Sequence, residues 1–399
     1  MANNSFSKSF TQQEAMSQDA IDAAIEVLKT GRLHRYNVIE DELSAVSQLE
    51  LDYANFQGSK YCLACASGGY ALSVSLKAAG LSKGERVLTN MYTLAPVPGA
   101  IYNSGGRAIF IEINKDLVLD LEDLVKKIKS SGSRFLLLSH MRGHIVDMDN
   151  IAKIVKDNNI TLIEDCAHTM GAKWGDNMSG NYGLAACFST QTYKHINSGE
   201  GGLITTNDDE FMARAIVMSG SYMLYDRHKS APMKEVFEKL KLDTPNYSGR
   251  MDNLRAAILR PQLKNLYVNI KRWNERYSAI EGILSRTKYI SLPFRNKKES
   301  YVGSSIQFRV PGISKSLATK FIDMNKKHGV EIKWFGDDNP SGYTSNHKSW
   351  KYVDSQNLQK SDEILSSLFD LRIPLTFSIE DCILIAKIIV ESIEEIYTD

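Results

Sequence analysis

Two side chains in the first two-thirds of the chain could do chemistry that a scaffold does not need, Lys194 and Asp165. Lys194 follows the run "CFSTQTY" and precedes the turn "INSGEGG". A lysine amine held in a pocket has a lowered pKa and can attack a carbonyl group. Asp165 ends the run "TLIED", where a buried carboxylate needs a cationic partner. The alternatives are a solvated lysine and an exposed or helix-capping aspartate.

A pair of glycines could bind an anion. Gly68 and Gly69, in "ASGGYAL", lie between a predicted strand and a predicted helix. Glycine lets the backbone approach a phosphate closely, and the N-terminus of the helix adds favourable partial charge. The pair fits neither the Rossmann nor the Walker pattern, which disfavours NAD and nucleoside triphosphates. A turn without a ligand is the alternative.

Together, a phosphate-binding turn, a carboxylate and a lysine meet the three needs of pyridoxal 5'-phosphate (PLP). The phosphate needs an anchor, the pyridinium nitrogen needs a carboxylate, and the aldehyde needs an amine. The combination is more specific than any one of its parts, and it predicts a PLP site without a metal.

A mostly parallel sheet would bring these residues together. Apolar runs alternate with helical patterns near residues 71–80, 120–130 and 148–158, which is typical of α/β crossover units. The predicted strands are "YCLACA", "ERVLTN", "RAIFIEI", "RFLLLSH", "TLIEDCA", "AACFST" and "GGLITT". Ligands of such sheets bind beyond the carboxyl ends of the strands, where Asp165 and the glycine pair are expected.

The length of 399 residues favours more than one domain. We expect an N-terminal arm and helix at 1–40, a large PLP-binding domain at 41–260 and a smaller α+β domain at 261–399. The last range contains "SSIQFRV", "VEIKWFG" and "RIPLTF", and its clearest loop covers residues 336–348.

Composition limits the possible partners. The chain has 48 Lys+Arg and 47 Asp+Glu, so its net charge of +1 predicts no general attraction to nucleic acid or to an anionic membrane. No signal peptide and no run of about 18 apolar residues is present, which predicts a cytoplasmic protein. Five scattered cysteines predict reduced thiols. Cys62 and Cys65 form an isolated C-x-x-C inside an apolar run, which makes a redox or zinc site the less favoured interpretation.

Three motifs in one order resemble the DegT/StrS group of fold type I PLP-dependent sugar aminotransferases. The group typically shows S-G-T-A-A-L, E-D-x-A-Q/H-x-x-G-A and F-S-F-x-x-x-K-x-x-x-x-G-E-G-G. The chain has "SGGYAL", "EDCAHTMGA" and "FSTQTYKHINSGEGG". The likeness extends over nearly the whole chain, and it implies the fold type I architecture with a large and a small domain.

The resemblance assigns roles to these positions. It implies that Lys194 binds the cofactor as a Schiff base and moves protons, that Asp165 pairs with the pyridinium nitrogen, and that His168 lies near the phenolic oxygen. The residues that it implies for the phosphate are Gly68, Gly69 and Ser189. Sugar dehydratases of the group carry histidine in place of the lysine. Lys194 therefore favours an aminotransferase, and we expect the neighbouring His195 to lie on the surface.

The chain departs from the group's pattern at three places. Gly69 replaces the threonine of S-G-T and removes a hydroxyl from the phosphate site. The aromatic residue that stacks on the ring is replaced by Leu94, with Tyr92 two residues earlier, and either could cover the ring. The group's G-Y-N-Y-R-M becomes "PNYSGRM", in which Ser248 or Asn246 would contact the partner subunit's phosphate. The resemblance thereby implies a homodimer with shared active sites.

Further residues could face a substrate, because arginine binds carboxylates and aromatic rings pack on sugar faces. These candidates are Arg35, Tyr36, Arg142, Tyr222, Arg227 and Trp334. Surface arginines and core aromatics are the alternative interpretation.

The sequence therefore predicts a PLP-dependent aminotransferase with a ping-pong mechanism. An amino acid, expected to be L-glutamate, would donate its amino group to a keto or aldehydo sugar, either nucleotide-linked or a free sugar acid. A PLP-dependent dehydratase or oxidase of the same fold, or a non-catalytic PLP-binding regulatory protein, stays open.

Overall fold

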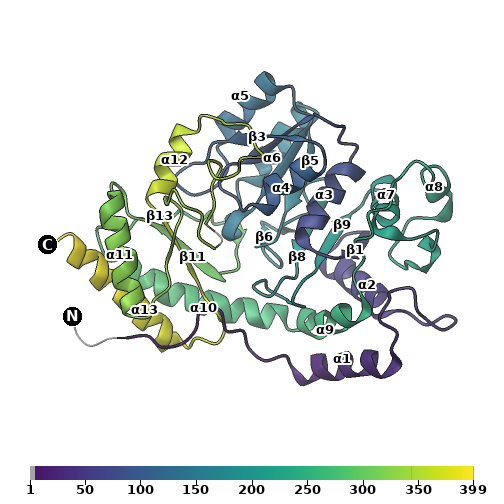
Figure 1. The fold of residues 1–399 in the computed structure, drawn as a ribbon, viewed down its shortest axis with the longest axis horizontal. Coiled ribbons are helices and arrows are strands. Elements are labelled where there is room, and N and C mark those ends of the chain that lie inside the picture. The colour runs from purple at the N-terminus through teal and green to yellow at the C-terminus, as the bar shows by residue number, and fades with distance from the viewer. Residues whose placement is uncertain (1–4, 343, 399) are drawn as a thin grey trace.

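The centre of the protein is a seven-stranded sheet in the order β1-β9-β8-β5-β4-β2-β3. The computed structural model describes residues 5–342 and 344–398, and Figure 1 shows the sheet between layers of helices. The strands are β1 Tyr61–Cys65, β2 Arg86–Asn90, β3 Arg107–Ile111, β4 Phe135–Ser139, β5 Thr161–Asp165, β8 Ala185–Ser189 and β9 Gly202–Thr206. The neighbouring strands from β8 to β3 pair in parallel, whereas β9 is antiparallel to both of its neighbours.

Every strand predicted for this half of the chain lies in the sheet, and the predicted α/β class is confirmed. The β1, β4, β8 and β9 strands are buried at every residue. Both faces of the sheet are covered by helices, which explains why the strands read as continuous apolar runs. The reversed direction of β9 was not predicted, because its sequence does not encode which neighbours it joins.

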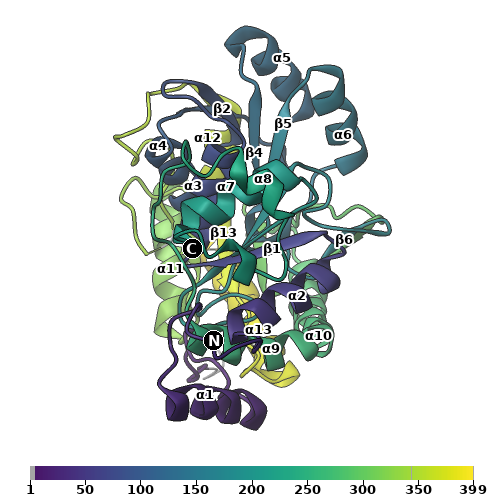
Figure 2. The same cartoon turned by 90° about the vertical axis from the view of Figure 1, so that its right-hand side faces the viewer.

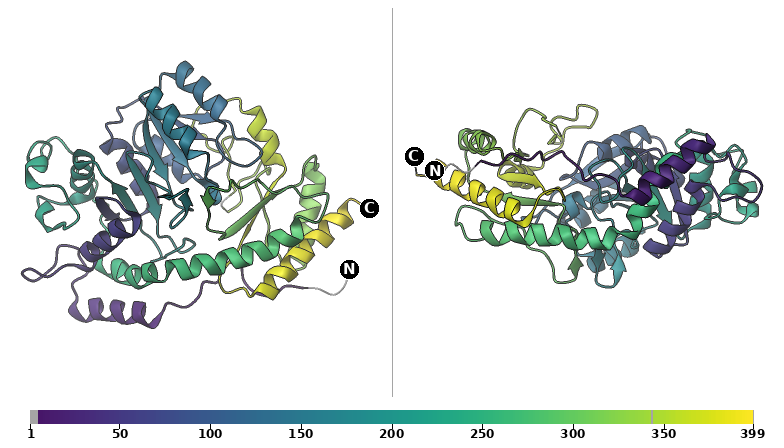
Figure 3. Two further views of the ribbon diagram at one scale, coloured as in Figure 1. Left: turned by 180° about the vertical axis from the view of Figure 1, so that it is seen from behind. Right: turned by 90° about the horizontal axis from the view of Figure 1, so that it is seen from below.

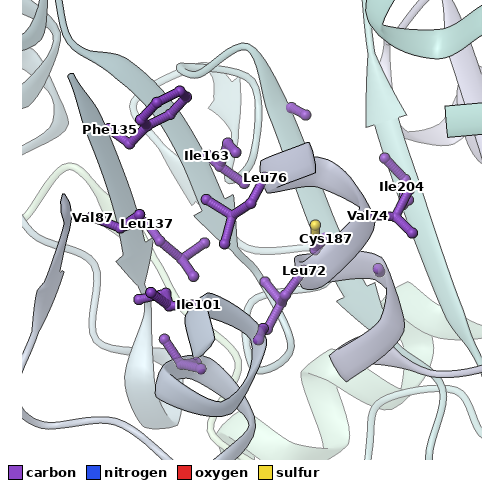
Figure 4. Close-up of a cluster of buried hydrophobic side chains, with 14 of the residues drawn as sticks. Leu72, Val74, Leu76, Val87, Ile101, Phe135, Leu137, Ile163, Cys187 and Ile204 are labelled. Carbon is purple, nitrogen blue, oxygen red and sulfur yellow. The ribbon is translucent and has the colours of Figure 1, made fainter. Parts of the chain in front are cut away.

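One face of the sheet packs against α3 Gly68–Ala78, α4 Pro96–Asn103 and α7 Asp209–Gly220. Figure 4 shows the interior of this layer, where Leu72 and Leu76 of α3 lie near Leu137 and Ile163 of the sheet. The opposite face packs against α2 Ala45–Gln57, α5 Leu121–Ser131, α6 Met148–Asp157 and α9 Asn253–Lys264. Two separate apolar layers therefore hold the sheet rigidly.

Side-chain caps fix where helices on both faces of the sheet begin. Ser67 caps α3 by accepting a hydrogen bond from the backbone of Tyr70 at 3.1 Å. Asp147 caps α6 and accepts hydrogen bonds from the backbone N–H groups of Asp149 and Asn150. Such caps satisfy N–H groups that have no partner within the helix.

The C-terminal part, called the small domain below, packs helices against a separate antiparallel sheet in the order β11-β13-β12. Its strands are β11 Ser305–Arg309, β12 Lys333–Trp334 and β13 Leu368–Arg372, and its helices are α10 Leu266–Leu284, α11 Lys315–Lys327 and α13 Ile379–Ile396. The long helix α10 runs from the large sheet to this part (Figures 1 and 3). Phe6 and Phe10 of the N-terminal segment pack into the same apolar cluster as α13.

Some segments connect the two parts. Phe335, Trp350 and Leu358 belong to the apolar cluster of the large sheet, so the chain returns to that sheet between β12 and α12 Gln359–Ser366. The predicted loop 336–348 has no helix or strand in its described residues. The helix α1 Gln18–Thr30 packs on α9 and lies at the bottom of the view in Figure 2. The boundaries at residues 40 and 260 stay a prediction.

The remaining elements are short. The strands β6 Lys173–Trp174, β7 Asn177–Met178 and β10 Glu299–Ser300 form a small sheet, and α8 Lys234–Glu238 lies beside α7. Within the described residues, the helices include none that is both long and apolar enough to span a bilayer. All five cysteines are buried and free.

Candidate active site

The predicted chemistry-bearing residues meet in one cavity of about 390 Å³. The ends of β4, β5 and β8 supply Ser139, Asp165 and Ser189, and the start of α3 supplies Gly68 and Gly69. Lys194 enters from the loop after β8, and the small domain contributes residues of β11 and β13. The cavity therefore lies beyond the carboxyl ends of the parallel strands, as expected for an α/β sheet.

Lys194 lies in this cavity with its amine close to the ring of His168. The Nζ atom is 2.8 Å from His168 Nε2. Burial, followed by the positive charge of Arg142, lowers the pKa of Lys194 to about 7 although Asp165 opposes the shift. Burial and the nearby lysine also hold the pKa of His168 well below its usual value. The neutral amine that nucleophilic chemistry requires is therefore accessible near neutral pH.

Asp165 is buried and is held by two donors. The hydroxyl of Ser139 donates to its Oδ2 at 2.8 Å, and the backbone N–H of Ala167 donates to its Oδ1 at 3.1 Å. Each carboxylate oxygen therefore has one donor, and the two bonds fix the direction of the carboxylate. The interpretation of Asp165 as an exposed residue is wrong, because it is only 7% exposed and lines the cavity. It caps no helix, because β5 is followed by the strand β6.

The start of α3 forms a narrow cradle against β8. A Cβ atom added at Gly68 would lie 2.9 Å from the Cβ of Ser189, whereas one added at Gly69 would meet nothing closer than Pro96 at 3.9 Å. The first N–H groups of a helix have no partner within it and attract anions. Gly202 lets β9 pass beneath the turn, because its Cβ would lie 2.4 Å from the carbonyl oxygen of Ser67.

The two candidates for covering a flat ligand differ in position. Leu94 lines the cavity and is partly buried. Tyr92 is fully buried and packs edge-on against Phe335, with ring centroids 5.2 Å apart. Of the two, only Leu94 lines the cavity.

His195 is buried, so the prediction that it lies on the surface is wrong. Only 5% of it is exposed, its Nε2 is 3.1 Å from the hydroxyl of Ser304, and its ring packs against Trp273. Burial, followed by the charge of Lys194, lowers its pKa to about 3. It lines a second cavity of about 290 Å³ that reaches Lys194 from the side of the N-terminal segment. Lys194 therefore lines both cavities, whereas His195 lines only the second of the two.

Among the predicted substrate residues, Arg142 lines the main cavity of its own chain. Arg35 is buried in a two-bond ion pair with Glu50, and both bonds are 2.9 Å long. Tyr36 bonds to His228, and Trp334 donates to the carbonyl of Ser366 inside the small domain. These three side chains are used in holding the fold together.

The other predicted contacts lie on an exposed surface outside that cavity. Tyr222 and Arg227 are exposed, as are Asn246 and Ser248. The loop that carries the last two is anchored beside the cradle, because Ala66 donates its backbone N–H to Gly249 at 2.8 Å. Their roles toward a partner subunit stay a prediction.

The sequence did not reveal several residues of the site. Arg372 at the end of β13 lines the cavity, with its guanidinium 3.7 Å from the ring centroid of Tyr193. Gln191 and Ser139 line it as well. Tyr193 and Gln191 adjoin Lys194 in sequence, so proximity could have suggested them. Nothing in "LRIPLTF" marks Arg372, which reaches the site only through the packing of the small domain.

These groups fit PLP in their chemistry. The cradle at α3 suits a phosphate, Asp165 suits a protonated ring nitrogen, and Lys194 suits an aldehyde. A Cβ at Gly68 would crowd Ser189, so the glycine keeps the start of α3 open beside β8, where a phosphate could approach the backbone.

The fold and this site define a class of protein. Residues 15–390 match the DegT/DnrJ/EryC1/StrS aminotransferase family, and the chain belongs to that family. The predicted family is confirmed.

Curated relatives of this chain differ in their stated roles. One is a pleiotropic regulatory protein of Geobacillus stearothermophilus, 28% identical over 66% of this chain and 65% of its own length. Another is the dTDP-3-amino-3,4,6-trideoxy-alpha-D-glucose transaminase of Micromonospora megalomicea subsp. nigra, 29% identical over 64% of this chain and 63% of its own length. The chain thus aligns with slightly under two-thirds of each of these two relatives.

Solved structures share the fold over almost the full length. A GDP-4-keto-6-deoxymannose-3-dehydratase with a trapped PLP-glutamate geminal diamine has a TM-score of 0.82 at 19% identity, covering 96% of this chain and 100% of that one. The aminotransferase TlmJ from Streptoalloteichus hindustanus also has a TM-score of 0.82, at 17% identity, covering 96% and 98%. At these identities the likeness shows the fold alone, and the predicted fold type is confirmed.

Proposed function

We propose that this protein is a PLP-dependent aminotransferase that moves an amino group from L-glutamate to a keto or aldehydo sugar, nucleotide-linked or a free sugar acid. The observation that carries the proposal is that Lys194, Asp165 and the cradle at α3 line one cavity. Membership of the aminotransferase family supports it. Relatives that act as a sugar transaminase and as GDP-perosamine synthases support the substrate class.

When bound, PLP supplies an aldehyde that exchanges amines and a ring that accepts the electrons left when a proton departs from the substrate. The residues of the chain supply the rest. Lys194 would hold the cofactor and carry the proton, because its pKa of about 7 allows both protonation states near neutral pH. Asp165, fixed by Ser139, would keep the ring nitrogen protonated. Gly68, Gly69 and Ser189 would hold the phosphate.

The ring of His168 would accept a hydrogen bond from the amine of Lys194 when that amine is charged. Its Nε2 contacts the amine and its pKa is well below the usual value, so the ring is neutral and can accept from the charged amine. This contact orients Lys194 across the cavity. We infer that His168 is a positioning residue at the reactive end.

We also propose a homodimer in a cytoplasmic setting. Exposed apolar side chains gather on the segments before and after α8, and they are Tyr222, Met223, Met233, Leu242 and Tyr247. They adjoin Asn246 and Ser248, which supports a partner subunit at this surface. The buried, free cysteines support a reducing compartment.

A spectrum of the PLP-loaded protein tests the proposed function. L-Glutamate should remove the visible absorbance band of the lysine-bound cofactor, and 2-oxoglutarate should restore it. Lys194→Ala protein, run in parallel, should not form the normal band. A band that stays unchanged with L-glutamate and with every other amino acid would contradict the aminotransferase proposal and favour a dehydratase, an oxidase or a regulatory protein.

A further inference from the structure

The cavity has a second charged end, formed where the turn after β4 meets the small-domain sheet. Arg142 lies in the short helix η1 Met141–Gly143 and adopts a left-handed backbone with φ of 55° and ψ of 23°. This conformation is uncommon for residues other than glycine. The next residue, Gly143, also has a positive φ of 80°, and a Cβ there would lie 3.2 Å from the carbonyl oxygen of His168. The turn therefore holds Arg142 close to the segment that carries His168.

Arg142 is buried but incompletely satisfied. Only 9% of it is exposed, and its Nη2 lies 2.8 Å from Asp370 Oδ2. This contact is an ion pair and not a hydrogen bond. Within the described residues, Arg142 Nε and Nη2 have no hydrogen-bond partner. Buried guanidinium N–H groups normally find an acceptor, so the site has donor capacity to spare.

The small-domain sheet adds a second guanidinium at the same place. Asp370 and Arg372 are two residues apart on β13 and so point to the same face of the sheet. Arg372 lines the cavity over the ring of Tyr193. Asp370 Oδ1 already accepts from Gln307 at 2.7 Å. The carboxylate of Asp370 is therefore shared, and it cannot neutralise two arginines.

A third positively charged side chain, Lys333, belongs to the same sheet as Asp370 and Arg372. Lys333 on β12 stands opposite Asp370 in the register of the sheet. Burial lowers the pKa of Lys333 to about 8. The attraction of Asp370 opposes this shift, and repulsion by Arg142 and Arg372 adds to it. Burial and then Arg142 also lower the pKa of Arg372. In both shifts burial is the largest cause, and the repulsion that adds to it comes from arginines at this end of the cavity.

The other acidic groups that line the cavity do not neutralise these positive charges. Asp165 lies at the end of β5 and is bonded to Ser139 and Ala167. Glu200 is exposed in the glycine-rich turn. Arg142 and Arg372 both act electrostatically on Lys194. A negative group bound by the two arginines would therefore lie in the same cavity as the reactive amine and act on its charge.

We propose that Arg142 and Arg372 form a carboxylate-binding subsite beside Lys194, closed from one side by the large sheet and from the other by the small domain. Two planar guanidinium groups match the geometry of a carboxylate. The inference deepens the proposed function, on which it rests for the identity of the ligand. The carboxylate belongs either to the amino donor or to a sugar acid that accepts the amino group.

Isothermal titration calorimetry tests the subsite directly. The protein is incubated with PLP in inorganic phosphate, so that the cradle at α3 is filled whether or not PLP stays bound. Glutarate represents the donor's carboxylates and D-glucuronate represents a sugar acid. Glutaramide and D-glucose are their neutral counterparts. We expect both carboxylates, or one of them, to bind at least about 10-fold more tightly than the matching neutral compound.

Substitution then identifies the arginines. Arg142→Gln and Arg372→Gln should each weaken carboxylate binding about 10- to 100-fold, because a hydrogen-bonded ion pair is lost. Arg309→Gln is the matched control, since Arg309 is on β11 of the same sheet and donates to Ser367 outside the cavity. Arg142→Lys and Arg372→Lys, which keep the charge, guard against a failure to fold, and circular dichroism checks every variant.

The outcomes separate the sources of the ligand. Loss confined to glutarate assigns the subsite to the donor, loss confined to D-glucuronate assigns it to the acceptor, and loss of both means that the two substrates use it in turn. Equal binding of charged and neutral compounds, or unchanged binding in both glutamine variants, overturns the subsite. Carboxylate binding that depends on the arginines, together with an absorbance spectrum that L-glutamate does not change, would support the subsite and refute the aminotransferase proposal.

Discussion

Lys194 Nζ lies 2.8 Å from His168 Nε2, although the two residues come from the loops after different strands. The contact places a weakly basic ring, with a pKa well below its usual value, beside an amine whose pKa is lowered to about 7. A lysine in this environment is neutral at a pH where an ordinary lysine is charged. The pH dependence of cofactor capture follows from this relationship.

The rate at which cofactor-free protein captures added PLP should rise through pH 7 and level off near pH 8. With a pKa of about 7 the amine is roughly nine-tenths neutral at pH 8, whereas an ordinary lysine with a pKa of about 10.4 is almost fully protonated there. Stopped-flow absorbance at a series of pH values measures the rate. A rate that keeps rising above pH 9 would mean that the pKa of Lys194 is not lowered.

Removing the charge of Asp165 should slow amino-group transfer much more than removing the Ser139 hydroxyl that donates to it. Asp165→Asn should lower the rate constant of the L-glutamate half-reaction by about 10²–10³-fold, since a buried charge beside the ring is lost. Ser139→Ala removes one bond of 2.8 Å and should cost roughly 10-fold. Single-turnover spectroscopy measures both. Equal effects would contradict separate roles for the carboxylate and its partner.

Substitutions at the two glycines of the cradle should act in opposite directions. Gly68→Ala forces its Cβ to within 2.9 Å of Ser189 and should weaken PLP binding at least about 10-fold. Gly69→Thr has room for its Cβ and returns a hydroxyl to the phosphate site, so it should tighten binding roughly 10-fold. Equilibrium dialysis measures the dissociation constants. Weaker binding in Gly69→Thr protein would argue against a phosphate at this turn.

Charge introduced on the exposed apolar surface should separate the proposed dimer. Met223→Asp with Leu242→Asp should shift the sedimentation coefficient from dimer to monomer and weaken PLP binding. Phe294→Asp alters an exposed apolar residue on another segment and is the control. A wild-type protein that sediments as a monomer would remove the basis for shared active sites.

Local patterns predicted the strands and the cofactor side of the site, because these depend on short-range features. "TLIED" ends in Asp165, the last residue of β5, and "CFSTQTYK" contains the end of β8 and then Lys194, so each segment predicted both a strand and a residue of the site. The antiparallel β9 depends on which strands become neighbours, which no single segment encodes. Arg372 joins Arg142 only through the packing of the small domain against the large one. His195 looked exposed because a polar neighbour of a glycine turn gives no sign of burial.

The most direct test of the central claim is to locate the covalent bond between protein and cofactor. PLP-loaded protein is reduced with borohydride, digested and analysed by mass spectrometry. We predict a pyridoxyl phosphate adduct on Lys194 and none on the same peptide of Lys194→Ala protein. An adduct on another lysine, or an unmodified Lys194 in protein that has bound PLP, would contradict the role of Lys194 as the chemical centre.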